Sequence, residues 1–377
     1  MNLKRIAFVG NSSFSIYKFR LGVMKSFVED GYSVYAIAPP DDYSEFFEKE
    51  NITYIPLTID AQGTNIFKDI LYTTSLLNIY KKNKIDFIFH YTIKPIIYGS
   101  IACRILKIPS IAITTGLGYA FESTNFLNKV VTGLYRTSLR SVLEVWFLNR
   151  NDKGVFLKNK IVPENKTFVL NGEGIDSSYY FPMEQNIENE KITFLLLSRL
   201  IKDKGIREYV NAARILKNRN LNIECQLLGK VEPESSKTIS IDEVKFWHTE
   251  GVINYIGESI DVRSFIANSD CVVLPSHYNE GVPRCLMEGM SMEKPIITTN
   301  NVGCVELIRD GINGLMCNKR DSEDLAEKME TMSKLSPEER KKMGKKGREL
   351  ILELFDEKKI IATYRQKFQY FTENRGD

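Results

Sequence analysis

Short apolar runs alternate with longer amphipathic stretches along the whole chain. The apolar runs are four to five residues long in places and uninterrupted by charge, which is typical of strands buried on both faces of a parallel sheet. In the first half of the chain they predict strands at 6–9, 34–38, 87–89, 111–114 and 145–148. In the second half they predict strands at 193–197, 225–228, 254–256, 271–275 and 296–298.

Helical periodicity fills the intervals between these runs, clearest at 16–30, 94–106, 206–218 and 357–371. Strands that alternate with helices predict doubly wound α/β domains. A polar stretch without periodicity, 181–190, separates two such series. We therefore expect a first domain at 1–182, a second at 183–355 and a C-terminal helix at 356–377, and 377 residues are enough for two separate cores.

Composition and charge exclude several classes of protein. With 43% apolar and 26% charged residues the chain resembles a soluble globular protein, and no apolar run reaches the length of a membrane span. The first ten residues lack the features of a signal peptide, and the six cysteines form no C-x-x-C, so we expect a cytoplasmic protein with reduced thiols. Residues 1–180 carry 21 Lys and Arg against 16 Asp and Glu, too weak an excess for nucleic acid but compatible with an anionic membrane or a diphosphate.

Two glutamates separated by seven residues give the strongest chemical signal. Glu280 lies in a polar loop after the buried run 271–275, and Pro283 marks the start of a helix. Glu288 is the one acid inside that helix, which is apolar nearly all round. Since a buried carboxylate needs a polar partner, Glu288 either meets an arginine or backbone donor, or binds ligand hydroxyls at the carboxyl end of the sheet.

A second cluster follows the strand at 193–197, where Ser198-Arg199-Leu200 leads to Lys204-Gly205 and a helix. An arginine fork and a lysine point charge together stabilise the charge that develops on a leaving diphosphate. The N–H groups of the helix beginning near Pro283 can add to this. The alternative is two solvated basic residues in a surface loop.

Taken in order, these two clusters resemble the G-R-L-x-x-x-K-G and E-x7-E motifs of the retaining family 4 glycosyltransferases of the GT-B fold, with Ser198 in place of the usual glycine. The resemblance implies two facing Rossmann-like domains with a cleft between them, and a C-terminal helix that crosses back to the first domain. It also implies that Glu280 approaches the donor sugar and Glu288 the ribose, with Arg199, Lys204, Glu280 and His90 as catalytic residues. The donor-binding residues that it implies are Gly10, Asn11, Ser198, Gly229, Gly257, Gly281, Val282, Pro283, Arg284, Cys285, Leu286 and Glu288.

Residues that follow the predicted strands of the first half resemble those of a subgroup of family 4 enzymes. This subgroup builds bacterial surface polysaccharides on polyprenyl diphosphate. His90 and Lys94 follow the strand at 87–89, Gly116 and Gly118 follow the next one, and Arg20 lies on the first helix. We expect Lys94, Arg20, Gly116 and Gly118 to contact the acceptor or a phosphate. His90 either faces the sugar or is a structural histidine. Gly10 is not part of a G-x-G-x-x-G fingerprint.

A basic stretch, 126–143, is the remaining feature. On a continuous helix Lys129, Arg136 and Arg140 share one face, opposite a broad apolar side. Such a helix can lie on an anionic membrane, although an ordinary surface helix has the same pattern.

The sequence therefore predicts a retaining glycosyltransferase that needs no cofactor and, because there is no D-x-D triplet, no metal ion. We expect it to move a hexose-type sugar from a nucleotide donor, UDP-linked by preference, to a lipid-diphosphate-linked glycan at the cytoplasmic membrane face. Two alternatives stay open: a nucleotide-sugar 2-epimerase of the same fold, and a non-catalytic sugar-nucleotide-binding protein. The sugar, its linkage and the acceptor's structure are open as well.

Overall fold

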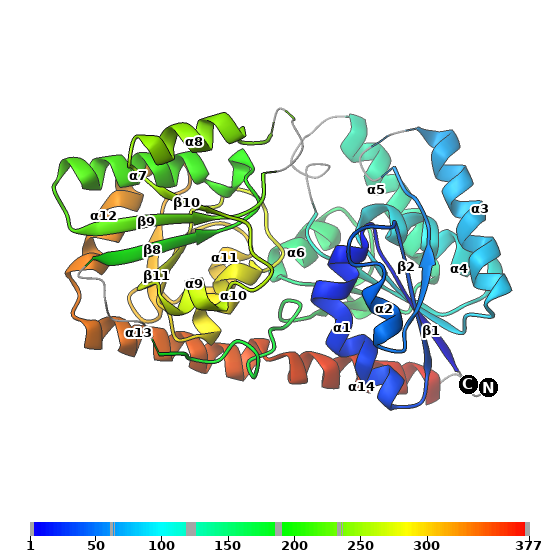
Figure 1. Cartoon of the computed structure of the whole chain (residues 1–377). Coiled ribbons are helices and arrows are strands. Elements are labelled where there is room, and N and C mark those ends of the chain that lie inside the picture. Colours follow the sequence, from blue (N-terminus) through cyan, green and yellow to red (C-terminus); the bar gives the residue numbers. More distant parts are fainter. Residues whose placement is uncertain are drawn as a thin grey trace. The chain divides into compact units, whose positions relative to one another are not determined.

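A computed structural model describes residues 4–60, 63, 65–117, 126–184, 191–231, 235 and 237–373, without the side chains of 126 and 127. The chain forms two compact units: unit 1 is Met1–Gly174 with Glu357–Asp377, and unit 2 is Ile175–Asp356 (Figure 1). The expected first domain ran to 182, but the segment after Gly174 packs within unit 2. There Ile175 forms a parallel bridge with Asp356, and the Tyr180 carbonyl accepts a hydrogen bond from Ser291.

Unit 1 is built on a seven-stranded parallel sheet in the order β3-β2-β1-β4-β5-β6-β7. Its strands are β1 (Arg5–Val9), β2 (Ser33–Ala38), β3 (Thr53–Pro56), β4 (Phe87–Tyr91), β5 (Ser110–Thr114), β6 (Glu144–Phe147) and β7 (Thr167–Val169). The five central strands are those predicted from the sequence. The edge strands β3 and β7 were not predicted, because they are short and only partly buried.

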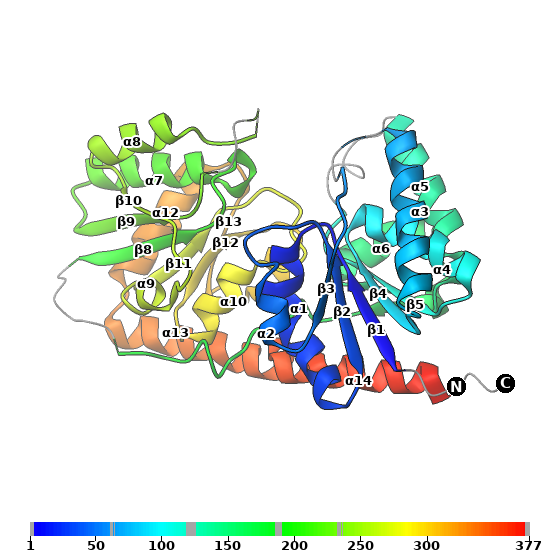
Figure 2. The same cartoon turned by 45° about the vertical axis from the view of Figure 1, so that its right-hand side comes forward.

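Helices cover both faces of this sheet (Figures 1 and 2). They are α1 (Ser13–Glu29), α2 (Phe46–Lys49), α3 (Ile66–Lys82), the π-helix η1 (Pro95–Gly99), α4 (Ser100–Leu106), α5 (Phe126–Ser138), α6 (Arg150–Lys158) and α14 (Glu357–Glu373), with 3-10 turns η3 (Leu139–Ser141) and η4 (Glu164–Lys166). One face carries Phe8 and Phe89 against Phe27 of α1 and Tyr364 of α14. The other face packs against α3, α4 and α5.

The basic helix predicted at 126–143 is shorter than expected. It ends at Ser138, and Arg140 lies in the 3-10 turn that follows. A 3-10 turn winds more tightly than an α-helix, so Arg140 does not continue the line of Lys129 and Arg136 that the helical spacing predicted.

Unit 2 has a six-stranded parallel sheet in the order β10-β9-β8-β11-β12-β13. Its strands are β8 (Ile192–Leu197), β9 (Ile223–Leu228), β10 (Asn254–Gly257), β11 (Cys271–Leu274), β12 (Ile296–Thr299) and β13 (Gly314–Cys317). Its helices are the 3-10 turn η5 (Lys202–Lys204), α7 (Ile206–Asn218), α8 (Ile241–Thr249), α9 (Arg263–Ala267), α10 (Arg284–Ser291), α11 (Cys304–Leu307), α12 (Ser322–Lys334), α13 (Pro337–Leu350) and the π-helix η6 (Ile351–Phe355).

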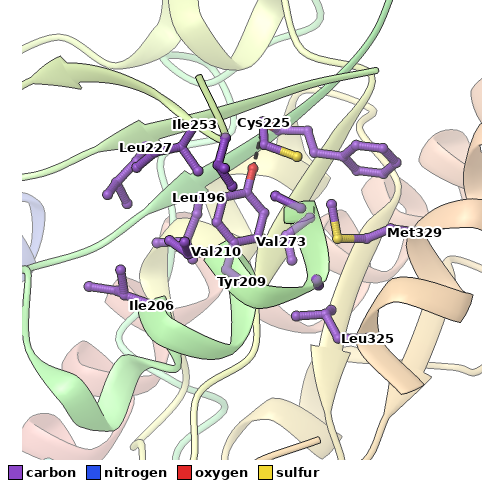
Figure 3. Packing of buried hydrophobic residues seen from close by; sticks show 14 of the residues in the cluster. Leu196, Ile206, Tyr209, Val210, Cys225, Leu227, Ile253, Val273, Leu325 and Met329 are labelled. Atoms are coloured by element: carbon purple, nitrogen blue, oxygen red, sulfur yellow. Dashed lines mark hydrogen bonds between the residues drawn. The ribbon is translucent and has the colours of Figure 1, made fainter. Parts of the chain in front are cut away.

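The core between this sheet and α7 and α12 is closely packed. Figure 3 shows Tyr209 of α7 among Leu196, Val210 and Val273, with Met329 of α12 nearby. The Tyr209 hydroxyl is fully buried and donates a hydrogen bond of 2.9 Å to the carbonyl of Phe194. Satisfying this polar group keeps the cost of burying it low.

Both sheets share one topological property. Strand order reverses between β1 and β4 in unit 1 and between β8 and β11 in unit 2. In open α/β sheets ligands bind outside the carboxyl ends of the strands at such a reversal. The predicted pair of Rossmann-like domains is thus confirmed, and each has a defined edge at which to look for a site. Within the part of the chain that the structure describes, we found no helix with both the length and the apolar character needed to cross a bilayer.

Candidate active site

The carboxyl edge of unit 2 holds the two predicted charge clusters together. The Lys204 ammonium, just after β8, pairs with the Glu280 carboxylate in the loop after β11. Ser276 donates a second hydrogen bond of 2.9 Å to the same carboxylate oxygen. The side chains of Lys204 and Glu280 are 14% and 11% exposed, so most of their surface is buried but a ligand can still contact the pair.

The two loops that carry this pair are joined through their backbones. The N–H groups of His277 and Tyr278 both donate to the carbonyl of Asp203, at 3.0 and 3.1 Å. Gly205, which ends the η5 turn, has a φ of +76°, and a Cβ there would lie 2.0 Å from the Pro275 carbonyl oxygen. Only glycine fits both the backbone conformation and this approach, so the turn seats Lys204 directly against β11.

Arg199 differs from Lys204 in being exposed. Among the residues that the structure describes, its guanidinium has no ion-pair partner. Ser198 lies beside it and donates to the Arg199 carbonyl at 3.1 Å. Gly229 and Gly257, at the carboxyl ends of β9 and β10, lie along the same edge, where the Gly229 N–H donates to the Gly257 carbonyl at 2.7 Å.

The N-terminus of α10 opens onto this edge as well. Pro283 precedes the helix and no side chain caps it, so the N–H groups of Cys285 and Leu286 in the first turn can face an anion. Just before it, the Gly281 carbonyl oxygen would lie 2.5 Å from a Cβ at Gly303, whose φ is +78°. The loop from Gly281 into the helix is therefore held at close range to the segment after β12.

The structure limits how three of the predicted donor residues in this loop can reach a ligand. The Leu286 side chain is 0% exposed and packs in the core, and Val282 is partly buried against the same cluster. Only their backbone groups can therefore reach a ligand. The Cys285 thiol is half-buried, and burial raises its pKa, so it is a neutral side chain rather than a thiolate.

Glu288 has the polar partners that its burial requires. Arg284, one turn earlier on α10, donates to its carboxylate at 3.1 Å, and the hydroxyl of Tyr180 makes a hydrogen bond to it. Burial, followed by the charge of Glu288, raises the pKa of Tyr180 and keeps that hydroxyl protonated as a donor. Sequence reasoning missed Tyr180; its only signal is a tyrosine pair placed before the polar stretch at 181–190.

The carboxyl edge of unit 1 begins with Gly10 and Asn11 after β1. The Gly10 N–H donates to the Ile37 carbonyl at 3.1 Å, and Asn11 is half-buried. Arg20, expected as an acceptor or phosphate contact on the first helix, is instead 3% exposed. Its guanidinium pairs with Glu173 and lies 4.4 Å from the ring centre of Tyr91, so protein groups occupy it.

His90 and Lys94 are also held by protein groups. His90 belongs to β4, is 0% exposed, and its Nε2 lies 3.0 Å from the Tyr80 hydroxyl of α3. Burial lowers its pKa to about 3, and it is a core histidine rather than a sugar contact. The Lys94 ammonium pairs with Asp69 at 2.6 Å, and Tyr98 donates to the same carboxylate at 2.7 Å.

Two glycines complete the predicted set. Gly116 follows β5 with a φ of +120°, which places a glycine-specific turn at the carboxyl edge of unit 1. Gly118 lies outside the described residues.

A parallel two-unit fold with cations and an uncapped helix at one strand edge is suited to an anionic ligand, and comparison with known proteins identifies the class. Residues 5–149 match the family described as "Glycosyl transferase 4-like", and residues 181–350 match "Glycosyl transferases group 1". The chain belongs to these glycosyltransferases, of GT-B fold and family 4 type. The transferase prediction is thereby confirmed.

Curated relatives match most of the chain. It is 26% identical over 341 residues to the N,N'-diacetylbacillosaminyl-diphospho-undecaprenol alpha-1,3-N-acetylgalactosaminyltransferase of Campylobacter jejuni, covering 86% of this chain and 88% of that protein. It is 25% identical over 274 residues to the UDP-Gal:alpha-D-GlcNAc-diphosphoundecaprenol alpha-1,3-galactosyltransferase of Escherichia coli, covering 69% and 70%.

Solved structures agree on the fold. A glycosyltransferase from Rickettsia africae superimposes with a TM-score of 0.81 at 19% identity, covering 99% of this chain and 100% of that one. HepE from Anabaena, solved in complex with UDP, superimposes with a TM-score of 0.79 at 17% identity, covering 97% and 100%.

Proposed function

We propose that this glycosyltransferase moves a hexose-type sugar from a UDP-linked donor onto a lipid-diphosphate-linked glycan, with retention of configuration and without a metal ion. Two relatives that match most of the chain are named as transferases acting on diphospho-undecaprenol-linked sugars, and one of them is named for a UDP-linked donor. We assign the product of this enzyme to the surface polysaccharides or glycans.

The grouping of Arg199, Lys204 and Glu280 at the β8/β11 reversal carries this proposal. A nucleotide sugar releases a diphosphate, and negative charge builds on its oxygens as the glycosidic bond breaks. The exposed Arg199, the Lys204 ammonium held by Glu280 and the first N–H groups of α10, which no side chain caps, are donors at one strand edge, and such an arrangement stabilises this charge. These cationic and dipolar groups supply the stabilisation that a divalent metal provides in other transferases.

The remaining residues receive roles by position. Glu280, whose carboxylate is shared by Lys204 and Ser276, approaches the sugar from the loop after β11, and Glu288 accepts hydrogen bonds from the ribose hydroxyls. The backbone of Gly281–Leu286, with Ser198, Gly229 and Gly257 along the same edge, lines the donor. In unit 1, Gly10, Asn11 and Gly116 offer close backbone approach at the strand ends.

The reaction then needs no protein base. The acceptor hydroxyl oxygen attacks the anomeric carbon on the face from which the diphosphate leaves, and the bond to the leaving oxygen breaks. A leaving phosphate oxygen takes the hydroxyl proton, so charge and atoms balance between acceptor and nucleoside diphosphate. Configuration at the anomeric carbon is retained because entry and departure share one face.

We also place the enzyme on the inner face of the cytoplasmic membrane, where a lipid-linked acceptor would be found. In unit 1 the exposed cations Lys129 and Arg136 of α5 support contact with an anionic surface, with Arg140 nearby in η3. Arg136 also donates to the carbonyls of Asn159 and Lys160 at 2.8 and 3.1 Å, so it has a structural contact as well.

A direct test is transfer from a panel of UDP-sugars to undecaprenyl-diphosphate carrying one sugar, assayed with EDTA present. We expect one UDP-sugar to give a lipid-linked disaccharide whose new linkage keeps the donor's anomeric configuration. Conversion of a UDP-sugar to its epimer without acceptor would assign the enzyme to the epimerases, and donor binding without any product would make it a sensor. Activity that appears only after Mg²⁺ or Mn²⁺ is added would overturn the metal-independent mechanism.

A further inference from the structure

The first two turns of α3 expose a cluster of large apolar side chains. Ile66, Phe67, Ile70 and Leu71 are 67%, 75%, 55% and 66% exposed. Exposed apolar residues are ordinarily scattered singly, and four adjacent ones mark a surface that is covered in use. We call these four residues the α3 tip.

The rest of the same helix behaves differently. Thr74, Asn78 and Lys81, which continue along the outer side of α3, are exposed and polar. The apolar surface is therefore confined to the start of the helix. A small terminal tip suits shallow insertion better than it suits a groove-binding or coiled-coil contact, which needs an apolar stripe along the whole helix.

The topology places this tip at the functional edge of unit 1. In a parallel sheet each crossover helix begins beyond the carboxyl end of the strand before it, and α3 follows β3 as α5 follows β5. Both helices pack on the π-helix η1, and their first turns lie at the same end of the helical layer (Figures 1 and 2). Gly10 and Gly116 lie along this same edge of the sheet.

Charge indicates what covers the tip. Residues 66–141, which include the outer layer α3–α5, hold ten Lys and Arg against three Asp and Glu. Asp69 is buried against Lys94, and Lys68 is paired with Asp60 at 3.0 Å, while Lys129 in the first turns of α5, at the same end of the layer as the tip, is exposed. An apolar tip on a layer with an excess of cations, one of them at the same end, is complementary to an anionic phospholipid surface.

We propose that the α3 tip inserts into the headgroup region of an anionic bilayer and holds the carboxyl edge of unit 1 at the membrane surface. This deepens the proposed function, on which it rests for the lipid-linked acceptor, by naming an apolar membrane contact distinct from the basic helix α5. Exposed cations supply the salt-sensitive part of binding, and the tip supplies a part that salt does not screen.

The test uses full-length protein and vesicles of phosphatidylglycerol and phosphatidylcholine that contain no acceptor, so its result is independent of transferase activity. The double variant Phe67→Ser/Leu71→Ser should lower the vesicle partition coefficient roughly tenfold per residue, as expected for losing a partly buried large apolar side chain. The Asn65 cap on α3 bonds the backbone N–H groups of Phe67 and Lys68, so the helix start is preserved.

The matched control is Phe246→Ser, which removes an exposed phenylalanine (64% exposed) from α8 of unit 2 and should leave partition unchanged. At 1 M salt, wild-type protein should keep the part of its vesicle binding that depends on the α3 tip. The triple variant Lys129→Gln/Arg136→Gln/Arg140→Gln should lose only the part of the binding that salt screens. Equal partition of the double variant and wild type would overturn the proposal, as would equal losses in the double variant and the control.

A second variant reports insertion directly. Both native tryptophans, Trp146 and Trp247, are buried, so Phe67→Trp adds the one exposed indole. Its emission should shift to the blue with anionic vesicles and be quenched by brominated lipid. Failure of either change, or a dimer in solution that the double variant abolishes, would show that the tip contacts something other than lipid.

Discussion

The carboxyl edges of the two sheets have the same topology but use charge in opposite ways. In unit 1, Arg20 and Lys94 tie helices to neighbouring segments through Glu173 and Asp69. In unit 2, Lys204 is held by Glu280 across two strand-end loops, beside the exposed Arg199 and the uncapped start of α10. One topology thus supports an internally neutralised edge and an edge prepared for an anion, and the difference lies in whether the cations are paired with acids of the surrounding helices and segments or placed in the strand-end loops.

The largest effect that we expect is on the stability of unit 1. Arg20→Ala leaves the mostly buried Glu173 carboxylate unpaired and removes the cation over Tyr91, which should lower the free energy of unfolding by about 3–5 kcal/mol. Urea unfolding followed by Trp146 fluorescence in a Trp247→Phe background measures unit 1 alone. Arg20→Met/Glu173→Gln should recover most of the loss. A stable Arg20→Ala protein that has lost donor or acceptor kinetics would mean that Arg20 contacts substrate after all.

Next in size is the effect of Lys204→Ala on catalysis. Removing a preorganised charge from the leaving diphosphate should lower kcat roughly 10²- to 10³-fold, and Arg199→Ala should act similarly. Initial rates at saturating donor measure this. Lys245→Ala, which removes an exposed lysine from α8, is the matched control and should be within a factor of two of wild type. A Lys204→Ala rate close to that of the control would mean that the edge of unit 2 is not the diphosphate site.

A smaller effect is expected from Glu288→Gln. Glutamine keeps the shape and can still bond Tyr180 and Arg284, but it loses the charge-assisted hydrogen bonds to ribose. Donor kcat/KM should fall by about 1–3 kcal/mol, mainly through a higher KM. The exposed Glu323→Gln on α12 serves as the control. Unchanged donor kinetics in a folded Glu288→Gln protein would leave Glu288 a purely structural partner of Arg284.

The smallest effect concerns His90 and pH. Burial lowers its pKa from the ordinary 6.5 to about 3, so the unfolded chain binds a proton that the folded one does not. The contribution of neutral His90 to the free energy of unfolding is therefore fully present above pH 6.5. It is lost as the pH falls toward 3, at about 1.4 kcal/mol per pH unit. His90→Gln should therefore be less stable than wild type at pH 7, with the gap narrowing by pH 5 in Trp146-monitored unfolding. Its kcat at pH 7 should be within a few-fold of wild type, and a loss comparable to that of Lys204→Ala would restore His90 to the catalytic set.

The central strands of both sheets could be predicted from the sequence, because a short and uninterrupted apolar run between polar turns is typical of a strand buried on both faces. The helix at 206–218 was predicted with its observed bounds, since glycine precedes it and its apolar spacing is regular. The edge strands β3, β7 and β13 escaped prediction because half-exposed strands of three or four residues leave no pattern. The π-helix η1 has no sequence signal that separates it from an α-helix.

The structure brings the predicted residues Lys204 and Glu280 together, whereas sequence reasoning failed where the direction in which a side chain faces matters. Phe89 and Tyr91 contact Tyr364 of α14, so the strand alternation turns His90 between them toward α3. That alternation could have been applied to the sequence once the strand was extended by two residues. Tyr180 and Ser276 could not have been found, because the hydrogen bonds that they make to Glu288 and Glu280 exist only in the folded unit.

The backbone joint between Asp203 and the loop after β11 has a consequence for engineering donor specificity. The N–H groups of His277 and Tyr278 bind the Asp203 carbonyl, and Gly205 packs against Pro275. The η5 turn and the loop 275–283 are therefore joined and are expected to move together. A chimera that grafts only the glutamate-bearing loop from a relative would pair it with a foreign η5 turn and displace Lys204. Segments 198–205 and 275–283 should therefore be exchanged as a cassette, and chimeras that swap both should outperform either single graft.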